Sequence, residues 1–360
     1  MSPEMFSAWA PGRVELLGNH TDYNGGVVLG AAIDRGLMVR GWRRDDERIA
    51  INSAAIGAIE IDGRELRPDP EHRWASYVLG VASELRALGL TSGGFSIEIT
   101  GDLPARAGLS SSAAIEVATA LFLLKLSRQT LPPLEIARSC QRAEHRFAGI
   151  KSGLLDQIIS LFGKRDHAVF FDCRNDEVRT IPFPAGFAII IADSGQRRDL
   201  SSSAYNLRRE ETHAAARALG VAALRDISLP QLATRSELPD LLRRRARHVV
   251  AENQRVLRSL DFLVAGNGAA FGRLLNESHE SSRDDFENST GELDQLVAIA
   301  QQLPGVLGAR LTGAGFGGAA IVLCERADAE KIASEISSRY EKATGIRSSA
   351  LVSELADGAR

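Results

Sequence analysis

The sequence has few cysteines and no long apolar run. Three cysteines occur among 360 residues, and Cys140, Cys173 and Cys324 are far apart and in no metal-ligand spacing. This argues against a disulfide framework or a zinc site, and reduced thiols are expected. No apolar run approaches the roughly 20 residues that span a bilayer, and residues 1–10 lack the pattern of a signal peptide. We expect a cytoplasmic protein with no membrane contact.

The sequence also lacks an excess of charge of one sign. Lys and Arg total 43 and Asp and Glu total 46, which gives a net charge of −3. That balance provides no electrostatic attraction for nucleic acid, and the basic cluster at 243–247 fits a solvated helix face better. A chain of 360 residues is long for one core and has room for two packed lobes.

Strand and helix patterns are both present. Short β-type runs dominate the first third, helical spacing follows, and the second half is mixed. The clearest helix covers 240–265, where apolar residues form one stripe. Composition does not fix a lobe boundary, and the segment 182–184 is the best candidate. Strands are expected at 27–33, 37–42, 48–52, 95–99, 168–172, 187–193, 306–311 and 319–323.

The most informative segment is 12–26, which reads GRVELLGNHTDYNGG. It combines a cation, carboxylates, an imidazole, a phenol and four glycines, and so many polar groups and glycines do not fit a packed helix or strand. Such a segment typically lines a site where backbone and short side chains meet a hydroxyl-rich ligand. His20 and Asp22 could imitate a metal pair, but no third ligand stands near them in the sequence.

A second motif, PARAGLSSSAA at 104–114, precedes the apolar helical run 115–126. Ser110 is a suitable N-cap, and the free N–H groups after it carry the positive end of the helix dipole, which binds phosphate. Serine hydroxyls there can add hydrogen bonds or coordinate Mg²⁺. The Gly-Lys-Ser/Thr ending of a Walker loop is absent. An ordinary serine-capped helix start is the alternative.

Two acidic residues follow twelve positions apart. Glu144 stands near the end of an amphipathic helix, just off its apolar face. Asp156 stands in the first turn of the next helix, where the dipole favours an ionised carboxylate. Each acid alone would be interpreted as a solvated or capping carboxylate.

A third motif, LTGAGFGGAAIVL at 311–323, contains the spacing G-x-G-x-x-G. A dinucleotide-binding fingerprint requires a helix directly after the glycines. The run 319–324 has strand character instead, so that interpretation is disfavoured. A purely structural glycine hairpin remains open.

Taken together, the three motifs resemble those of the GHMP kinases, and 12–26 resembles the galactokinase signature within them. The resemblance implies an α+β, two-lobed GHMP kinase fold with the active site in the cleft between an N-terminal domain, 1–182, and a C-terminal domain, 183–360. It implies an ATP-dependent sugar 1-kinase that uses Mg²⁺ with ATP and a monosaccharide as partners. A monomer or weak homodimer is expected.

The resemblance also implies residue roles. Asp156 would act as the base at the anomeric hydroxyl, with Arg13 beside it and the γ-phosphoryl group, while Ser112 and Glu144 would hold the metal. The further implied contacts are, for the sugar, Asn19, His20, Asp22, Gly153 and Tyr205; for ATP, Trp74, Arg106, Gly108, Leu109, Ser110, Ser111, Ser112 and Ala113; and, in the glycine-rich loop that closes over the site, Gly313, Gly315, Gly317 and Gly318.

Two departures from the galactokinase pattern keep alternatives open. Arg106 stands where the family usually has a glycine, and Glu15 and Asn19 stand where the family usually has Asn and Glu. The resemblance assigns the second of those positions to the 6-hydroxyl of the sugar, so a sugar 1-kinase for galacturonate, L-arabinose or 6-deoxygalactose is one alternative. Another is that Glu15 restores the missing charge. A non-catalytic regulator that binds sugar and ATP is the third.

Overall fold

The strands of the described residues form two sheets. The computed structural model describes residues 3–104, 108–196 and 202–360. One sheet has seven strands in the order β4-β3-β5-β2-β6-β7, with β1 paired to β2, and the other has four in the order β11-β8-β10-β9. The strands are β1 (Phe6–Leu17), β2 (Val27–Arg43), β3 (Arg48–Ser53), β4 (Gly57–Asp62), β5 (Phe95–Gly101), β6 (His167–Asp172), β7 (Glu177–Pro182), β8 (Phe187–Asp193), β9 (Val306–Leu311), β10 (Ala319–Glu325) and β11 (Ala350–Ser353).

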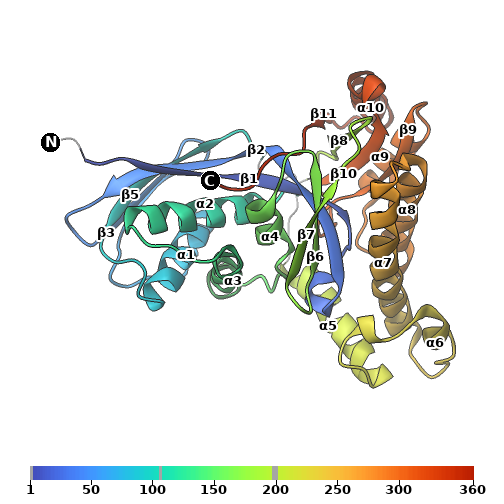
Figure 1. Cartoon of the computed structure of the whole chain (residues 1–360), viewed down its shortest axis with the longest axis horizontal. Helices are drawn as coiled ribbons and strands as arrows, with labels where there is room; N and C mark the ends of the chain where they lie inside the picture. Colours follow the sequence, from blue (N-terminus) through green and yellow to red (C-terminus); the bar gives the residue numbers. More distant parts are fainter. Residues whose placement is uncertain (1–2, 105–107, 197–201) are drawn as a thin grey trace.

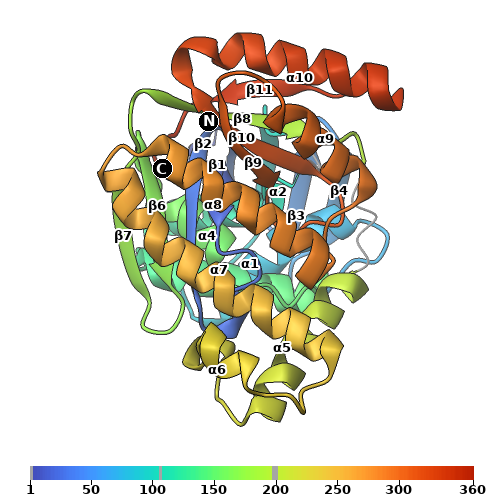
Figure 2. The same ribbon diagram turned by 90° about the vertical axis from the view of Figure 1, so that its right-hand side faces the viewer.

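The helices fall into groups along the chain. In Figure 1 the first four lie beneath the long β1 and β2 strands, and in Figure 2 α7 and α8 run side by side. The helices are α1 (Ser76–Ala87), α2 (Ser111–Leu126), α3 (Pro133–Ala143), α4 (Leu155–Phe162), α5 (Ser202–Leu219), α6 (Leu229–Ala233), α7 (Asp240–Val264), α8 (Gly268–Ser281), α9 (Gly291–Gln301) and α10 (Ala329–Thr344). Of the helices described, none is long and apolar enough to cross a membrane.

The start of β2 is buried on both faces, which explains its unbroken apolar sequence. Val28 and Ala32 pack in a cluster with α4, whereas Leu29 and Ala31 pack in a cluster that contains residues of α7 and α8. Because side chains alternate along a strand, the two sets point to opposite faces. The sheet is therefore covered by helices on both faces at this point.

The sequence predicted most elements. The helix expected at 240–265 is α7, and the strands expected at 187–193, 306–311 and 319–323 are β8, β9 and β10. The strands expected at 27–33 and 37–42 are one strand, β2. Its pairing with β1 shifts between Pro11 and Arg13, where one residue of β1 lies opposite three residues of β2, 33–35. The predicted domain boundary falls between β7 and β8 and stays a prediction.

Candidate active site

The first motif begins as strand and then folds into a tight polar turn. β1 ends at Leu17, and Gly18 and His20 both adopt positive φ, at 102° and 60°. The Thr21 hydroxyl lies 2.8 Å from the Gly18 carbonyl and 2.7 Å from that of Val27, which closes the turn. The backbone N–H of Gly18 donates to the Glu252 carboxylate of α7 at 2.9 Å. A helix distant in the sequence therefore fixes the turn.

Four of the predicted sugar contacts come together beside this turn. The His20 ring lies 5.2 Å from the Tyr205 ring of α5, and a Cβ on Gly153 would stand 1.9 Å from Asp22 Oδ2, so only glycine fits there. Burial, with a further contribution from the neighbouring Asp156, raises the pKa of Asp22 to about 7. The structure thus gathers an imidazole, a phenol and two carboxyl groups from three separate segments.

Arg13 and Asp156 form an ion pair at the centre of the site. Arg13 Nε donates to Asp156 Oδ1 at 2.6 Å, and Arg13 Nη1 donates to the Gly108 carbonyl at 2.7 Å. Arg13 is buried, whereas 30% of the Asp156 side chain is exposed. A buried cation therefore fixes a carboxylate that a ligand can still reach, next to the loop that precedes α2.

Ser110 does not cap α2 as the sequence suggested. It occupies the N-cap position, but its φ of 57° and ψ of 51° are left-handed and its side chain makes no capping hydrogen bond. Its hydroxyl donates to Asp156 Oδ2 instead. The prediction of a serine N-cap was wrong because a tertiary partner, 46 positions away, outcompetes the local N–H groups. Those N–H groups remain available at the start of α2.

The two predicted metal ligands are close enough for the Ser112 hydroxyl to favour the ionised form of Glu144. Glu144 accepts a hydrogen bond from the Ser152 hydroxyl. Burial raises the pKa of Glu144 to about 7, and the two serine hydroxyls partly offset the rise. A hydroxyl and a carboxylate oxygen side by side suit Mg²⁺, which uses few protein ligands and otherwise binds water and phosphate. Within the described residues, no group of three or more His, Cys, Asp or Glu side chains could hold a metal alone.

The glycine-rich motif is a turn between β9 and β10. Gly313, Gly315, Gly317 and Gly318 all have positive φ, and a Cβ on Gly315 would meet the Asn288 carbonyl at 2.1 Å. Strand β10 follows directly, as the sequence predicted, so the context of a dinucleotide fold is not met.

Among the described residues, no polar contact assigns a role to four further predicted ATP contacts, Trp74, Leu109, Ser111 and Ala113. Trp74 lies in a one-turn 3₁₀ helix, Arg73–Ala75, and is half-buried against the core under the first sheet. Leu109 and Ala113 are buried beside the loop, and Ser111 is half-buried. Arg106 lies outside the described residues.

Asn19, a predicted sugar contact, lies in a buried polar cluster beside the turn. Its side chain is fully buried and donates to Glu15 Oε1 at 2.9 Å and to the Gly313 carbonyl at 2.7 Å, rather than facing the group around Asp22. The expectation that Asn19 contacts the sugar stays a prediction, and in this structure the carboxamide is engaged by protein groups. Arg310, a buried partner of Glu15 at 3.1 Å, was not predicted from the sequence; an arginine inside the apolar run 306–311 was the available signal.

Comparisons with known proteins show which family the chain resembles along its whole length. Residues 76–164 match the GHMP kinases N terminal domain, 259–342 match the GHMP kinases C terminal domain, and 2–41 match the galactokinase galactose-binding signature. Galactokinase from Roseiflexus sp. (strain RS-1) is 44% identical over 355 residues, which are 97% of this chain and 91% of that protein. Galactokinase from Mannheimia succiniciproducens is 40% identical, over 95% of this chain and 91% of that protein.

A solved galactokinase structure has the same fold over nearly the whole chain. Lactococcus lactis galactokinase complexed with galactose superposes with a TM-score of 0.95 at 35% identity, over 99% of this chain and 95% of that one. Fold and site together define an ATP-dependent sugar kinase of the GHMP class. Within that class, the chain belongs to the galactokinase family.

Proposed function

We propose that the chain transfers the γ-phosphoryl group of ATP to the anomeric hydroxyl of galactose, yielding galactose 1-phosphate and ADP. The observation that carries this proposal is the Arg13–Asp156 ion pair, which joins the end of β1 to the start of α4 directly beside the loop before α2. Phosphoryl transfer depends mainly on positioning and on charge stabilisation, and this pair supplies both.

Asp156 is the proposed base. As the anomeric oxygen forms its bond to phosphorus and the bond to the ADP oxygen breaks, the hydroxyl proton passes to the Asp156 carboxylate. Arg13 holds that carboxylate in place from the buried side and adds a positive charge next to the transferring group. The Ser110 hydroxyl fixes the second carboxylate oxygen, so the base has one orientation.

The start of α2 and the metal pair are the proposed phosphate site. The backbone N–H groups after Ser110 point out of the helix with the positive end of its dipole. Ser112 and Glu144 would hold Mg²⁺, which when bound neutralises charge on the ATP phosphates. We further propose that the enzyme acts in the cytoplasm, as a monomer or weak homodimer.

Asp22 and Tyr205 are the proposed readers of the sugar hydroxyls, beside His20. A carboxyl group with a pKa of about 7 can both donate to and accept from hydroxyl groups near neutral pH. Buried polar partners of this kind discriminate strongly between epimers, because a misplaced hydroxyl leaves them unpaired.

An acceptor screen tests the proposal. ADP formation is measured with Mg-ATP and galactose, glucose, galacturonate, L-arabinose or 6-deoxygalactose, and the site of phosphorylation is read by ³¹P NMR. We expect turnover with galactose and a product phosphorylated at C1. Nucleotide and sugar binding with no ADP formation for any sugar would instead make the chain a regulator, and preferred turnover of a C6 variant would make it a different sugar 1-kinase.

A further inference from the structure

The Asn19 carboxamide has no unused hydrogen-bonding capacity. Its two N–H groups donate to Glu15 Oε1 at 2.9 Å and to the Gly313 carbonyl at 2.7 Å. Its oxygen accepts from Asn288 Nδ2 at 2.8 Å and from the Ser282 hydroxyl at 3.4 Å. A carboxamide offers two donors and two acceptor positions, so all four are occupied by protein groups in a side chain that is fully buried. A sugar hydroxyl would find nothing to bind there.

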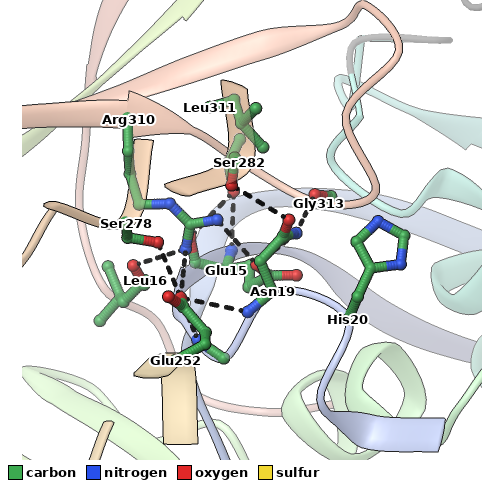
Figure 3. Close-up of polar contacts among 12 residues, drawn as sticks. Glu15, Leu16, Asn19, His20, Glu252, Ser278, Ser282, Arg310, Leu311 and Gly313 are labelled. Carbon is green, nitrogen blue, oxygen red and sulfur yellow. Dashed lines mark hydrogen bonds and ion pairs between the residues drawn. The ribbon is translucent and has the colours of Figure 1, made fainter. Parts of the chain in front are cut away.

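The partners of Asn19 converge on the glycine-rich loop, 313–316. The carbonyl of Gly313 accepts from Asn19, and the carbonyl of Ala314 accepts from Asn288 Nδ2 at 3.0 Å and faces His20 Nε2 at 2.9 Å. The N–H of Phe316 donates to the Asn288 carbonyl at 2.6 Å. Hydrogen bonds therefore join the loop to the polar turn of the first motif and to the segment after α8. Figure 3 shows Asn19 between Gly313 of the loop and Ser282.

These hydrogen bonds require a carboxylate at residue 15 and a carboxamide at residue 19, the reverse of the usual galactokinase pattern. Residue 19 faces two acceptors, Glu15 Oε1 and the Gly313 carbonyl, so it must donate twice. A carboxylate at 19 would present oxygens to both and could bind neither. Glu15 in turn accepts from Arg310, which Figure 3 shows on its far side from Asn19. A carboxamide is therefore the group that fits residue 19, and a carboxylate is the group that fits residue 15.

We propose that Asn19 is a positioning residue that fixes the glycine-rich loop against the sugar-binding turn and makes no contact with the C6 group of the sugar. The statement about the sugar rests on the proposed function. The contact between Asn19 and the loop does not depend on it. It follows that discrimination at C6 in this chain is independent of residue 19.

Amide hydrogen exchange of the ligand-free protein tests the loop contact without any substrate. We expect Asn19→Ala to speed exchange in peptides that cover 313–318 by about fivefold or more, the lower range for loss of a buried hydrogen bond. Asn253→Ala is the matched control: Asn253 is also a buried carboxamide but bonds Val27 and Val249 instead of the loop. Unchanged loop exchange in Asn19→Ala, or an equal increase in Asn253→Ala, would overturn the proposal.

Calorimetry with two sugars tests the C6 statement. We expect Asn19→Ala to change the dissociation constants of galactose and 6-deoxygalactose by the same factor, because the side chain acts through the loop. If Asn19→Ala weakens galactose binding by a factor about fivefold or more larger than it weakens 6-deoxygalactose binding, Asn19 contacts the C6 group directly and the proposal is contradicted. Should Asn19→Ala fail to fold, Asn288→Ala removes the second tie to the same loop and must give the same two results. If the wild-type protein does not phosphorylate galactose, only the proposed function is refuted. The hydrogen-exchange experiment still tests the contact between Asn19 and the loop.

Discussion

At the scale of the residue, the site concentrates carboxyl groups whose ionisation is opposed by burial. Asp22 and Glu144 both have a pKa of about 7, chiefly because each is taken out of water. Asp156 lies near both, yet remains partly exposed and paired with Arg13. Buried carboxyl groups of this kind suit a site that binds cations and hydroxyl groups. Keeping them ionised in the folded state lowers the free energy of unfolding, and this effect can be measured.

That cost predicts a pH-dependent effect of Asp22→Asn. A carboxyl group whose pKa rises from 3.8 to about 7 on folding binds its proton more tightly in the folded state, so its contribution to stability is lost as pH rises through that window. The free energy of unfolding of Asp22→Asn relative to wild type should therefore increase between about pH 4 and 7, by about 3–4 kcal/mol, and level off above. Urea unfolding at pH 4.5, 6 and 8 measures it. A constant difference would contradict the environment assigned to Asp22.

At the scale of the element, the glycine-rich turn is the most constrained segment of the site. Its residues from Gly313 to Gly318 include five with positive φ, among them Phe316, and its backbone approaches that of Asn288 too closely for a side chain at 315. The turn therefore depends on glycine for space as well as for conformation.

Two alanine substitutions separate these requirements. Gly315→Ala places a Cβ 2.1 Å from the Asn288 carbonyl at a φ of 76°, whereas Gly266→Ala, after α7, has a φ of 65° and open space around it. We expect Gly266→Ala to cost about 1–2 kcal/mol from backbone conformation alone, and Gly315→Ala to cost clearly more because of the clash. Thermal unfolding of both variants compares them. Equal shifts in Tm would show that the loop moves aside freely.

Elements were easier to predict from the sequence than contacts. The stripe of apolar residues in α7 and the apolar runs of β8 and β10 are local signals, and they gave the elements nearly at their observed limits. The Ser110 cap was predicted wrongly, and the buried contacts of Asn19 were not predicted, because the partners of these two residues, Asp156 and Gly313, are 46 and 294 positions away. No local spacing encodes such a pairing, so only the folded chain reveals that one hydroxyl bonds a carboxylate and one carboxamide faces a loop.

At the scale of the whole molecule, a buried charge network joins the first motif to the second half of the chain. Arg310 of β9 lies 3.1 Å from Glu15 of β1 and 3.9 Å from Glu252 of α7, and it is fully buried. Burial opposes the ionisation of Glu252, yet the guanidinium groups of Arg255 and Arg310 hold its pKa below the usual range. The polar turn after β1 and the glycine-rich loop are therefore supported by the same buried residues.

Removing one charged side chain from this network should lower the free energy of unfolding substantially. Arg310→Met would leave Glu15 and Glu252 buried without that cation, and we expect the free energy of unfolding to fall by about 3–5 kcal/mol. Arg339→Met is the control, because Arg339 and Glu335 form an exposed i, i+4 pair on α10, and it should cost less than about 0.5 kcal/mol. Urea unfolding measures both. A loss of under about 1 kcal/mol for Arg310→Met would mean that the network contributes little.

The most direct test of the whole account is the turnover of Asp156→Asn with galactose and Mg-ATP, beside its affinity for ATP. The substitution keeps the size of the side chain but removes the base that Arg13 and Ser110 orient. We predict that kcat falls about 10²–10⁴-fold while ATP binding is nearly unchanged. Retention of a tenth or more of the wild-type kcat would contradict the role of Asp156 and, with it, the mechanism proposed for this site.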